Sequence, residues 1–422
     1  MTAAGGDLVL RNARVVGAEE SLRDVEVRGG VIVNIGPALA VAGSPEELDL
    51  GGRLLSPGLV ETHLHLDKAM LMEQVTSGGG DLNDAIAQVA KLKRGFTPGD
   101  VHDRAARVLE QALRHGTTHV RTHLEVDPAV GLRSFDGIWP LIGEYAWALD
   151  LEICVFPQEG LLSNPGTDEL LVEALRRGAH AVGGAPYTDA DPRGQINRIF
   201  ELAREFDVDI DLHFDFGPGP DDLDLFYLCD QADRYSYGGR VTIGHVTKLA
   251  AARPALFERA ARRLAQAGVA LTVLPSTDLY LMGRDRTENK VRGVVEAHRL
   301  LGHGVNCSLS TNNVLNPFTP LGDVSLLRMA NLYANIAQVG SDEEFRACFD
   351  MITTRSAALL NLGGYGAAVG QAADLVVFDA TSRGEAVRAL SPLLFAVKRG
   401  VRTVTSPGVR LHRPAGAQAA GG

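Results

Sequence analysis

Apolar runs of strand length alternate with amphipathic helical stretches through the long middle of the chain, residues 58–367. The strand-like runs are 119–126, 150–158, 181–187, 208–216, 240–246, 269–276 and 305–313. A stretch such as 100–116 carries apolar or alanine residues at three- and four-residue spacing and ends at a glycine, which predicts a helix. With the run that leads into His63 and His65 counted first, the strands number eight. This alternation favours a (β/α)8 barrel, in which reactive residues lie at the C-terminal ends of the strands.

The two ends of the chain have a different pattern, in which short strand-like runs are separated by glycine-rich turns. Residues 7–56 contain three such runs, and the segments 372–380 and 395–408 have the same character. We therefore predict an α/β protein with two parts. Residues 1–57 together with 368–422 would form a small β-sandwich domain, and residues 58–367 would form the barrel.

Composition and charge fit a globular protein and exclude several classes of function. Hydrophobic residues make up 45% of the 422 and charged residues 22%, which is ordinary for a folded chain. The formal net charge of -11 offers no basic surface for nucleic acid. No apolar run approaches the roughly 18 residues of a membrane span, and the first residues do not resemble an export signal. The four cysteines are scattered without a C-x-x-C pair, so we expect no disulfide framework and a cytoplasmic location.

Histidine and other polar side chains are concentrated at the predicted strand ends. His63 and His65 are two residues apart, so in a strand they point to the same face and can both bind one cation. The other polar residues at these ends are His123, Glu125, Gln158, His213, Asp215, His245, Thr311, Asn312 and Asn313. A closed barrel would bring them into one cleft, and imidazole suits zinc, iron and similar transition metals. The pattern predicts a metal site at the mouth of the barrel.

Six motifs in register resemble those of the amidohydrolase superfamily, and within it the cytosine deaminase-like branch. They are LLSPGLVETHLHLDK, GTTHVRTHLEVD, FPQEGLLS, DLHFDF, IGHVTK and NPFTPLGD, and the closing AADLVVFDA and VKRGVRTV resemble the strands that complete the family's β-sandwich. The resemblance implies a metal-dependent hydrolase with one divalent ion, zinc or iron in the first place and cobalt or manganese otherwise. The implied ligands are His63, His65, His213 and an aspartate at the end of strand eight. It also implies that His245 orients the attacking hydroxide and that Gln158 hydrogen-bonds the substrate ring.

Two positions depart from this family pattern, and both departures affect proton transfer. Asn312 stands where the family has its strand-eight aspartate, and we assign it as the remaining metal ligand; the next aspartate is replaced by Asn313. Phe216 stands where the deaminases have the glutamate of a His-x-x-Glu pattern that begins at His213. A deaminase must deprotonate water and protonate the ring and the departing amine, and losing such a group typically costs about 10² to 10⁴ in rate. Both proton carriers of a deaminase are missing.

Other side chains at the strand ends are candidates for the missing proton carriers. Asp215, two residues beyond His213, and His245 are our first expectation for this role, and His123 is another base in reach. Further candidates are Glu125, Asp278 and Lys68. We expect the substrate to contact Gln158, Phe216, His123 and Asn313, in a pocket that aromatic side chains make more apolar than one built to read a nucleobase.

Three functions are compatible with these features. The first is a metal-dependent hydrolase that acts on a carbon–nitrogen (non-peptide) or related acyl bond of a small cyclic amide, carbamate, thiocarbamate or N-heterocycle. The second is an aminohydrolase of a pyrimidine- or triazine-like ring that recruits its proton carriers elsewhere, and the third is a catalytically inactive ligand-binding barrel. The expected partner is a small molecule, not nucleic acid or a membrane. Barrels of this type often form homo-oligomers, although no interface is visible in the sequence.

Overall fold

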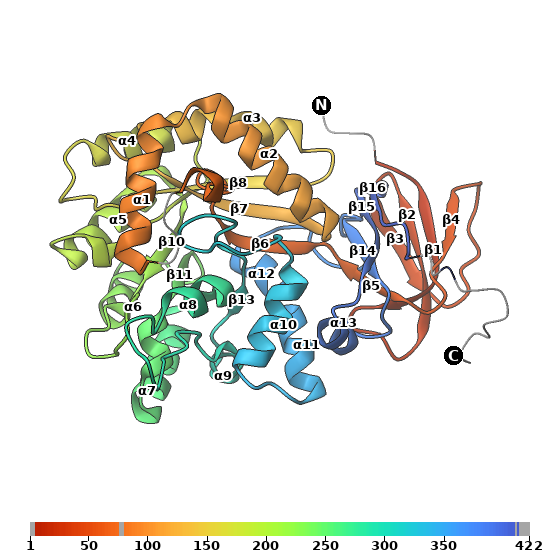
Figure 1. Ribbon diagram of the computed structural model, residues 1–422. Coiled ribbons are helices and arrows are strands. Elements are labelled where there is room, and N and C mark those ends of the chain that lie inside the picture. Colours follow the sequence, from red (N-terminus) through yellow and green to blue (C-terminus); the bar gives the residue numbers. More distant parts are fainter. Residues whose placement is uncertain (1–4, 76–79, 410–411, 413–422) are drawn as a thin grey trace.

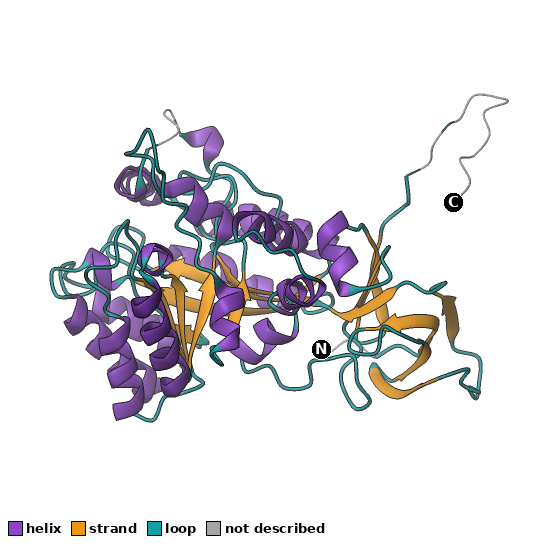
Figure 2. Ribbon diagram, turned by 90° about the horizontal axis from the view of Figure 1, so that it is seen from below, coloured by secondary structure: helices purple, strands orange, loops and turns teal. Residues whose placement is uncertain are grey.

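Two sheets, one of them curled into a barrel, divide the molecule into a large and a small body (Figure 1). The computed structural model describes residues 5–75, 80–409 and 412. A second view shows the barrel with its helices at one end of the molecule and the other sheet at the opposite end (Figure 2). The predicted fold class, an α/β barrel with a separate sheet from the chain ends, is confirmed.

The barrel consists of eight parallel strands that follow one another in chain order. They are β6 (Leu59–Leu64), β7 (Thr117–Glu125), β8 (Asp150–Phe156), β9 (Ala181–Val182), β10 (Asp209–Phe214), β11 (Val241–His245), β12 (Val269–Val273) and β13 (Cys307–Leu309). Every residue of β6 and β11 is buried, as expected for parallel strands covered on both faces. Hydrogen bonds bring the last strand back to the first: the Thr62 hydroxyl lies 2.6 Å from that of Ser310, and the Asn312 N–H donates to the His63 carbonyl oxygen. The barrel is therefore nearly closed.

Helices lie between consecutive barrel strands and after the last one. They are α1 (Leu82–Leu92), α2 (Pro98–Arg114), α3 (Arg133–Glu144), α4 (Thr167–Arg176), α5 (Pro192–Phe206), α6 (Leu225–Arg234), α7 (Pro254–Ala267), α8 (Pro275–Leu281), α9 (Ala297–Gly302), α10 (Leu326–Ile336), α11 (Asp342–Asp350) and α12 (Thr354–Leu359). Single turns of 3-10 helix add η1 (Met72–Gln74), η2 (Lys93–Gly95), η3 (Pro186–Thr188) and η4 (Thr247–Ala251). Local sequence sets the helix ends. The Thr97 side chain caps the start of α2, and α7 ends at Gly268 in a left-handed conformation.

The second sheet is built from both ends of the chain. Its strands are β1 (Leu8–Val15), β2 (Leu22–Arg28), β3 (Val31–Gly36), β4 (Glu46–Asp49), β5 (Leu54–Pro57), β14 (Leu375–Phe378), β15 (Leu393–Lys398) and β16 (Val401–Thr405), and α13 (Arg383–Ala389) lies between β14 and β15. β14 pairs antiparallel with β5, which joins the two ends. The sheet encloses a small apolar core of its own. The predicted domain limits, 1–57 with 368–422 and 58–367, stay predictions.

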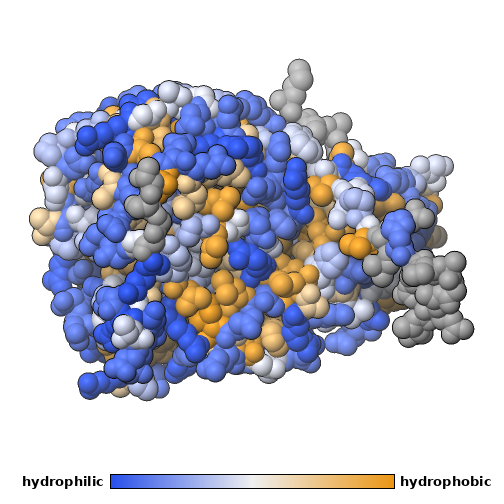
Figure 3. All heavy atoms as spheres, in the orientation of Figure 1, coloured by the Kyte–Doolittle hydropathy of each residue, from blue (hydrophilic) through white to orange (hydrophobic). Residues whose placement is uncertain are grey.

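A buried lysine joins the two bodies. Lys398 Nζ, in β15, lies 2.6 Å from an oxygen of Asp150 in β8 and 2.7 Å from one of Asp374. Figure 3 shows that most of the surface on one face is hydrophilic, with hydrophobic side chains gathered in the middle of that face. None of the helices in the described part of the chain is both long enough and apolar enough to cross a membrane.

Candidate active site and metal centre

Three imidazoles converge at the mouth of the barrel. His63 and His65 come from the end of β6 and His213 from β10, and Nε2 of His213 lies 3.1 Å from that of His63 and 3.0 Å from that of His65. Burial lowers the pKa of each ring, so the rings are neutral and their nitrogens can offer lone pairs. Nitrogen ligands about 2.0–2.1 Å from one ion lie roughly 3 Å apart. The structure thus brings these three predicted residues together in a geometry that fits a transition metal ion.

Neighbouring groups fix how the rings of His63 and His65 are turned. His65 Nδ1 lies 3.0 Å from the carbonyl oxygen of His123, so Nδ1 carries the proton and Nε2 is left free. The His63 ring packs against Gly244 of β11, where an added Cβ would lie 3.2 Å from Nδ1 and Cε1. A side chain at position 244 would therefore push the imidazole out of place, which explains a glycine inside this strand.

Asn312 lies beside the histidine cluster in a turn with a positive φ of 62°. Asparagine tolerates this left-handed conformation better than most residues. Its buried carboxamide has no hydrogen-bond partner in the described part of the chain, and it lines the same cavity as His65 and His213. Buried polar groups are almost always paired, so an unpartnered amide at this place fits a ligand of a bound ion.

The buried carboxyl group of Glu61 holds this turn against β6. One oxygen accepts from the Thr311 hydroxyl at 2.6 Å and from the Thr311 N–H at 3.2 Å, and the other accepts from the His63 N–H at 3.2 Å. Burial raises the pKa of Glu61 to about 7 despite these bonds. The carboxyl group therefore fixes the residue before Asn312 relative to a metal-facing histidine.

His123 and Asp211 lie behind the His63 ring and do not form a second metal site. The rings of His63 and His123 stack with centroids 3.7 Å apart and planes 20° apart. Asp211 Oδ1 lies 3.3 Å from His123 Nε2 and 3.9 Å from His63 Nδ1. An ion lies near the plane of each imidazole that binds it, and two stacked, nearly parallel planes cannot both contain one ion. Asp211, which Arg121 Nη1 contacts at 3.4 Å, lies closer to His123 than to His63.

His245 and Asp278 form a hydrogen-bonded pair in the cavity wall. His245 ends β11 with a positive φ of 71°, and its Nδ1 lies 2.6 Å from Asp278 Oδ1. The other oxygen of Asp278 accepts the N–H of Leu274. Burial raises the pKa of Asp278, and the neighbouring His245 opposes that shift. With Nδ1–H donated to the carboxylate, the Nε2 lone pair of His245 is left for the cavity.

Asp215 has partners other than those expected of a proton carrier. Its two oxygens accept the backbone N–H groups of Asp224 at 3.0 Å and Leu225 at 3.1 Å, so the side chain holds the start of α6. Burial raises the pKa of Asp215 to about 6. The residue is not among those that line the cavity next to the histidines.

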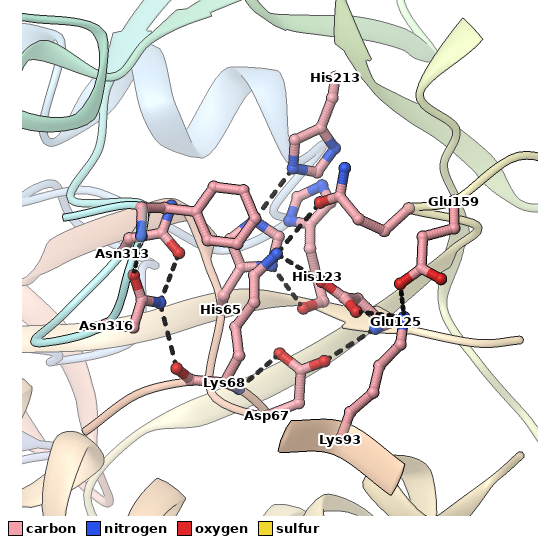
Figure 4. A network of polar contacts seen from close by, with 12 residues as sticks. His65, Asp67, Lys68, Lys93, His123, Glu125, Glu159, His213, Asn313 and Asn316 are labelled. Carbon is pink, nitrogen blue, oxygen red and sulfur yellow. Dashed lines mark hydrogen bonds and ion pairs between the residues drawn. The ribbon is translucent and has the colours of Figure 1, made fainter. Parts of the chain in front are cut away.

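A chain of buried charges leads from the cavity to the segment that carries α1 (Figure 4). Lys68 Nζ donates to Glu125 Oε1 at 2.7 Å and to Gln158 Oε1 at 3.2 Å. The second oxygen of Glu125 lies 3.0 Å from Lys93 Nζ. Burial acts to raise the pKa of Glu125, but the two ammonium groups outweigh it and lower the pKa. Lys93, in η2, also pairs with Asp127 and Glu159.

The cavity among these groups is narrow. Its lining side chains are His65, Lys68, Leu82, Gln158, Tyr187, His213, Phe216, His245, Thr277, Leu281, Asn312, Asn313 and Phe318. Of the residues predicted to act in catalysis or to contact the substrate, the structure brings to this lining His245, Asn312, Gln158, Phe216 and Asn313. Asp215 and His123 lie outside the lining.

Sequence reasoning gave too little weight to Lys68 and Asp278 and did not consider Lys93 or Glu61 as site residues. A signal existed for Lys68, which follows the His-x-His strand directly, and for Asp278, which comes just after the end of β12. Glu61 was visible as an acidic residue inside an apolar strand. Lys93 had no such signal, because it lies far along the chain from the histidines in an ordinary helical stretch.

Comparison with known proteins gives consistent similarities over nearly the whole chain. A model described as the amidohydrolase family matches residues 145–404. The N-isopropylammelide isopropyl amidohydrolase of Pseudomonas sp. strain ADP is 26% identical over 407 residues, which cover 93% of this chain and 96% of that protein. The pterin deaminase of Rhizobium rhizogenes is 26% identical over 362 residues, 85% and 82% of the two chains. The solved structure of 5-methylcytosine deaminase from Klebsiella pneumoniae, liganded with 5-fluorocytosine, has a TM-score of 0.91 and 28% identity, with 96% and 100% covered.

Proposed function

This chain belongs to the amidohydrolase family, and we propose that it hydrolyses a carbon–nitrogen bond of a small N-heterocycle and releases a substituted amine. It is a hydrolase of carbon–nitrogen bonds other than peptide bonds. The names of its relatives refer to an ammelide, a pterin and a methylcytosine, which supports a small nitrogen ring as substrate. The observation that carries the proposal is the convergence of three neutral imidazoles on one point beside a cavity.

We assign the metal centre to His63, His65 and His213, with Asn312 as a further ligand. A divalent transition metal there would supply Lewis-acid chemistry, lowering the pKa of a water molecule and polarising the bond to be broken. Zinc or iron is proposed, with cobalt or manganese as alternatives, because imidazole suits all of these ions. Since Asn312 is neutral, this ligand set contains no carboxylate to offset the charge of the ion.

Proton transfer is assigned to His245, which Asp278 orients. Nε2 accepts a proton from the attacking water and passes it to the leaving nitrogen. The water oxygen bonds to the ring carbon, the carbon–nitrogen bond breaks, and the amine departs with that proton. The carboxylate 2.6 Å from Nδ1 stabilises the positive charge that forms on the imidazole during the transfer.

Phe216 favours a substituted amine over ammonia as the leaving group. Its ring centroid lies 5.2 Å from that of His245 and 6.1 Å from that of Tyr187, so apolar surface borders the proton carrier. An alkyl or aryl group on the departing nitrogen can pack there, whereas ammonia gains nothing from it. An aminohydrolase of a pyrimidine- or triazine-like ring is the second candidate, supported by the similarity to 5-methylcytosine deaminase.

Metal analysis combined with matched substrates tests this function. We expect purified protein to carry a near-stoichiometric transition metal and to release alkylamines from N-alkylamino heterocycles faster than ammonia from the unsubstituted amino compounds. His63→Ala and His213→Ala should lose both the metal and the activity. Faster release of ammonia would favour the aminohydrolase. Protein that cannot be loaded with zinc, iron, cobalt or manganese would contradict both enzyme functions and leave the ligand-binding barrel.

We also propose a cytoplasmic location and a place in the cytosine deaminase-like branch. The cysteines Cys154, Cys229, Cys307 and Cys348 are free and buried, as in proteins of reducing compartments. The similarity to 5-methylcytosine deaminase over both bodies supports the branch. We propose a small-molecule substrate with no nucleic-acid or membrane partner, and a homo-oligomer stays a prediction.

A further inference from the structure

The orientation of the Asn313 side chain can be derived from nearby backbone N–H groups, because such groups can only donate hydrogen bonds. The N–H groups of Phe318 and Thr319 both donate to Asn316 Oδ1, at 3.0 and 3.1 Å. Asn316 must then turn its NH₂ group the other way, where it donates to Asn313 Oδ1 at 2.7 Å and to the Lys68 carbonyl oxygen at 3.1 Å (Figure 4). Because Asn313 accepts with its oxygen, its own NH₂ group is left for the cavity that it lines.

The same reasoning fixes the roles of Lys68 and Gln158. Lys68 Nζ is only a donor, and it donates to Gln158 Oε1 at 3.2 Å. The NH₂ group of Gln158 is then left for the cavity that it lines. Two N–H bonds of Lys68 go to Glu125 and Gln158, and the third is left beside Phe318, whose ring centroid is 4.3 Å from Nζ.

Side chains that could accept a hydrogen bond from a ligand are scarce around this cavity. Among the described residues, no aspartate or glutamate lines the cavity. The Glu125 carboxylate is engaged by ammonium groups, and His245 Nε2 is used for the proton in the proposed reaction. The Thr277 hydroxyl, 2.6 Å from that of Thr319, can serve in either role. Away from the histidine cluster, the polar groups whose roles are fixed are therefore all donors: Lys68 Nζ and the NH₂ groups of Gln158 and Asn313.

We infer that this site recognises an oxo-substituted N-heterocycle through two of its ring-bound oxygens, preferably as an anion, and rejects rings of the same size that carry amino groups in place of those two oxygens. The inference rests on the proposed function, because it concerns the substrate of that site. The donors of Lys68, Gln158 and Asn313 match carbonyl or oxyanion oxygens, and the ammonium charge of Lys68 favours a negative ring. The amino groups of a diamino ring would face other donors and stay unpaired, which is a strong basis for rejection.

The substitution Asn313→Asp tests this recognition at a single atom. One carboxylate oxygen would still accept from Asn316, and the other would replace the NH₂ group, so a donor becomes an acceptor without a change in size.

We compare zinc-loaded proteins by isothermal titration calorimetry with two ligands. One is barbiturate, whose O4–C5–O6 edge carries only acceptors in the anion, and the other is 2,4-diaminopyrimidine. Wild-type protein should bind barbiturate more tightly by about tenfold or more, and Asn313→Asp should reduce this ratio by about tenfold or reverse it. Asn335→Asp, an exposed position on α10, adds the same charge elsewhere and should leave the ratio unchanged.

A second variant removes the ammonium charge of Lys68 together with the carboxylate of Glu125 that pairs with it. Lys68→Met alone would leave Glu125 buried beside one ammonium group fewer, so it is combined with Glu125→Gln. In this double variant the affinity for barbiturate should fall by about tenfold, because a charged hydrogen bond is lost, while the affinity for 2,4-diaminopyrimidine should not fall. If one of the two variants fails to fold, the ligand affinities of the other test the inference.

Several results would overturn the inference. They are equal affinity of wild-type protein for the two rings, tighter binding of 2,4-diaminopyrimidine, no binding of either ring, and an unchanged ratio in Asn313→Asp. The measurement involves no turnover. Protein that prefers barbiturate but hydrolyses no carbon–nitrogen bond would therefore contradict the proposed function while it supports this mode of recognition.

Discussion

Asn312 and Phe216 occupy the two positions at which the resemblance to the cytosine deaminase-like branch predicts carboxylates for proton transfer. A neutral amide beside the histidines leaves the charge of a bound ion uncompensated, which favours deprotonation of water without help from a nearby carboxylate. The Phe216 ring supplies apolar contact to His245 in place of an acid. At the scale of single residues, the proposed reaction therefore carries the proton from water to the leaving nitrogen through His245.

Restoring both carboxylates should shift the chemistry towards deamination. We expect Phe216→Glu combined with Asn312→Asp to raise ammonia release from aminopyrimidines by about 10²-fold over wild type, because it returns both proton carriers. An ammonia assay across aminopyrimidines and aminotriazines measures this. The two single variants are the controls and should gain less. The absence of any gain in the double variant would count against an amino-heterocycle site as the origin of this pocket.

Asp278 is predicted to act by holding His245 in the productive tautomer. In Asp278→Asn the amide can present its NH₂ group to Nδ1, which would move the imidazole proton to Nε2 and block proton acceptance. We expect kcat to fall by about 10²-fold or more with the metal content unchanged. Asp285→Asn, at an exposed position close in sequence, should have no effect. Unaltered kcat in a fully metal-loaded Asp278→Asn enzyme would exclude this role.

The strand ends are held by short polar segments rather than by long regular elements. β13 has only three residues, and its continuation is tied to β6 through Thr62 with Ser310 and Glu61 with Thr311. At the scale of elements, these contacts close the barrel where backbone pairing is sparse. On the neighbouring side Lys93 ties the end of α1 to β7 through Glu125.

Lys93 is predicted to stabilise this arrangement strongly. Lys93→Met would leave Asp127 and Glu159 without their cation and Glu125 with one ammonium group instead of two. Loss of one partner of a buried ion cluster costs about 3–5 kcal/mol, so the thermal midpoint should fall by several degrees. Lys91→Met, at an exposed position in α1, should change stability by about 0.5 kcal/mol or less. Equal midpoints for the two variants in differential scanning calorimetry would refute the prediction.

At the scale of the whole molecule, the proposed metal centre would couple distant parts of the chain, since its histidines come from β6 and β10. An ion that binds the folded protein and not the unfolded chain stabilises it by about 2.7 kcal/mol at a hundredfold excess over Kd. We expect zinc to raise the thermal midpoint of metal-free protein and a chelator to lower it again. His213→Ala should show no rise with zinc, and a rise as large as that of wild type would place the ion elsewhere.

The sequence alone determined the number of barrel strands, the sheet from the two chain ends and the set of histidines that meet. These features depend on short-range rules. Apolar runs with glycine-marked turns define strands, and the spacing of His63 and His65 puts both on one face because strand side chains alternate. The parallel topology then places the ends of β6 and β10 at one mouth of the barrel. Family motifs in register pointed to the same fold.

Only the tertiary structure decided which polar group meets which. Asp215 and Asp278 both follow strands, yet Asp215 holds the start of α6 while Asp278 pairs with His245, 33 residues away. Lys93 reaches Glu125 from 32 residues away, and Asn313 takes its orientation from Asn316. A hydrogen bond requires atoms to come within about 3 Å. Such distances between loops depend on how every helix and strand packs, so no local pattern in the sequence can specify them.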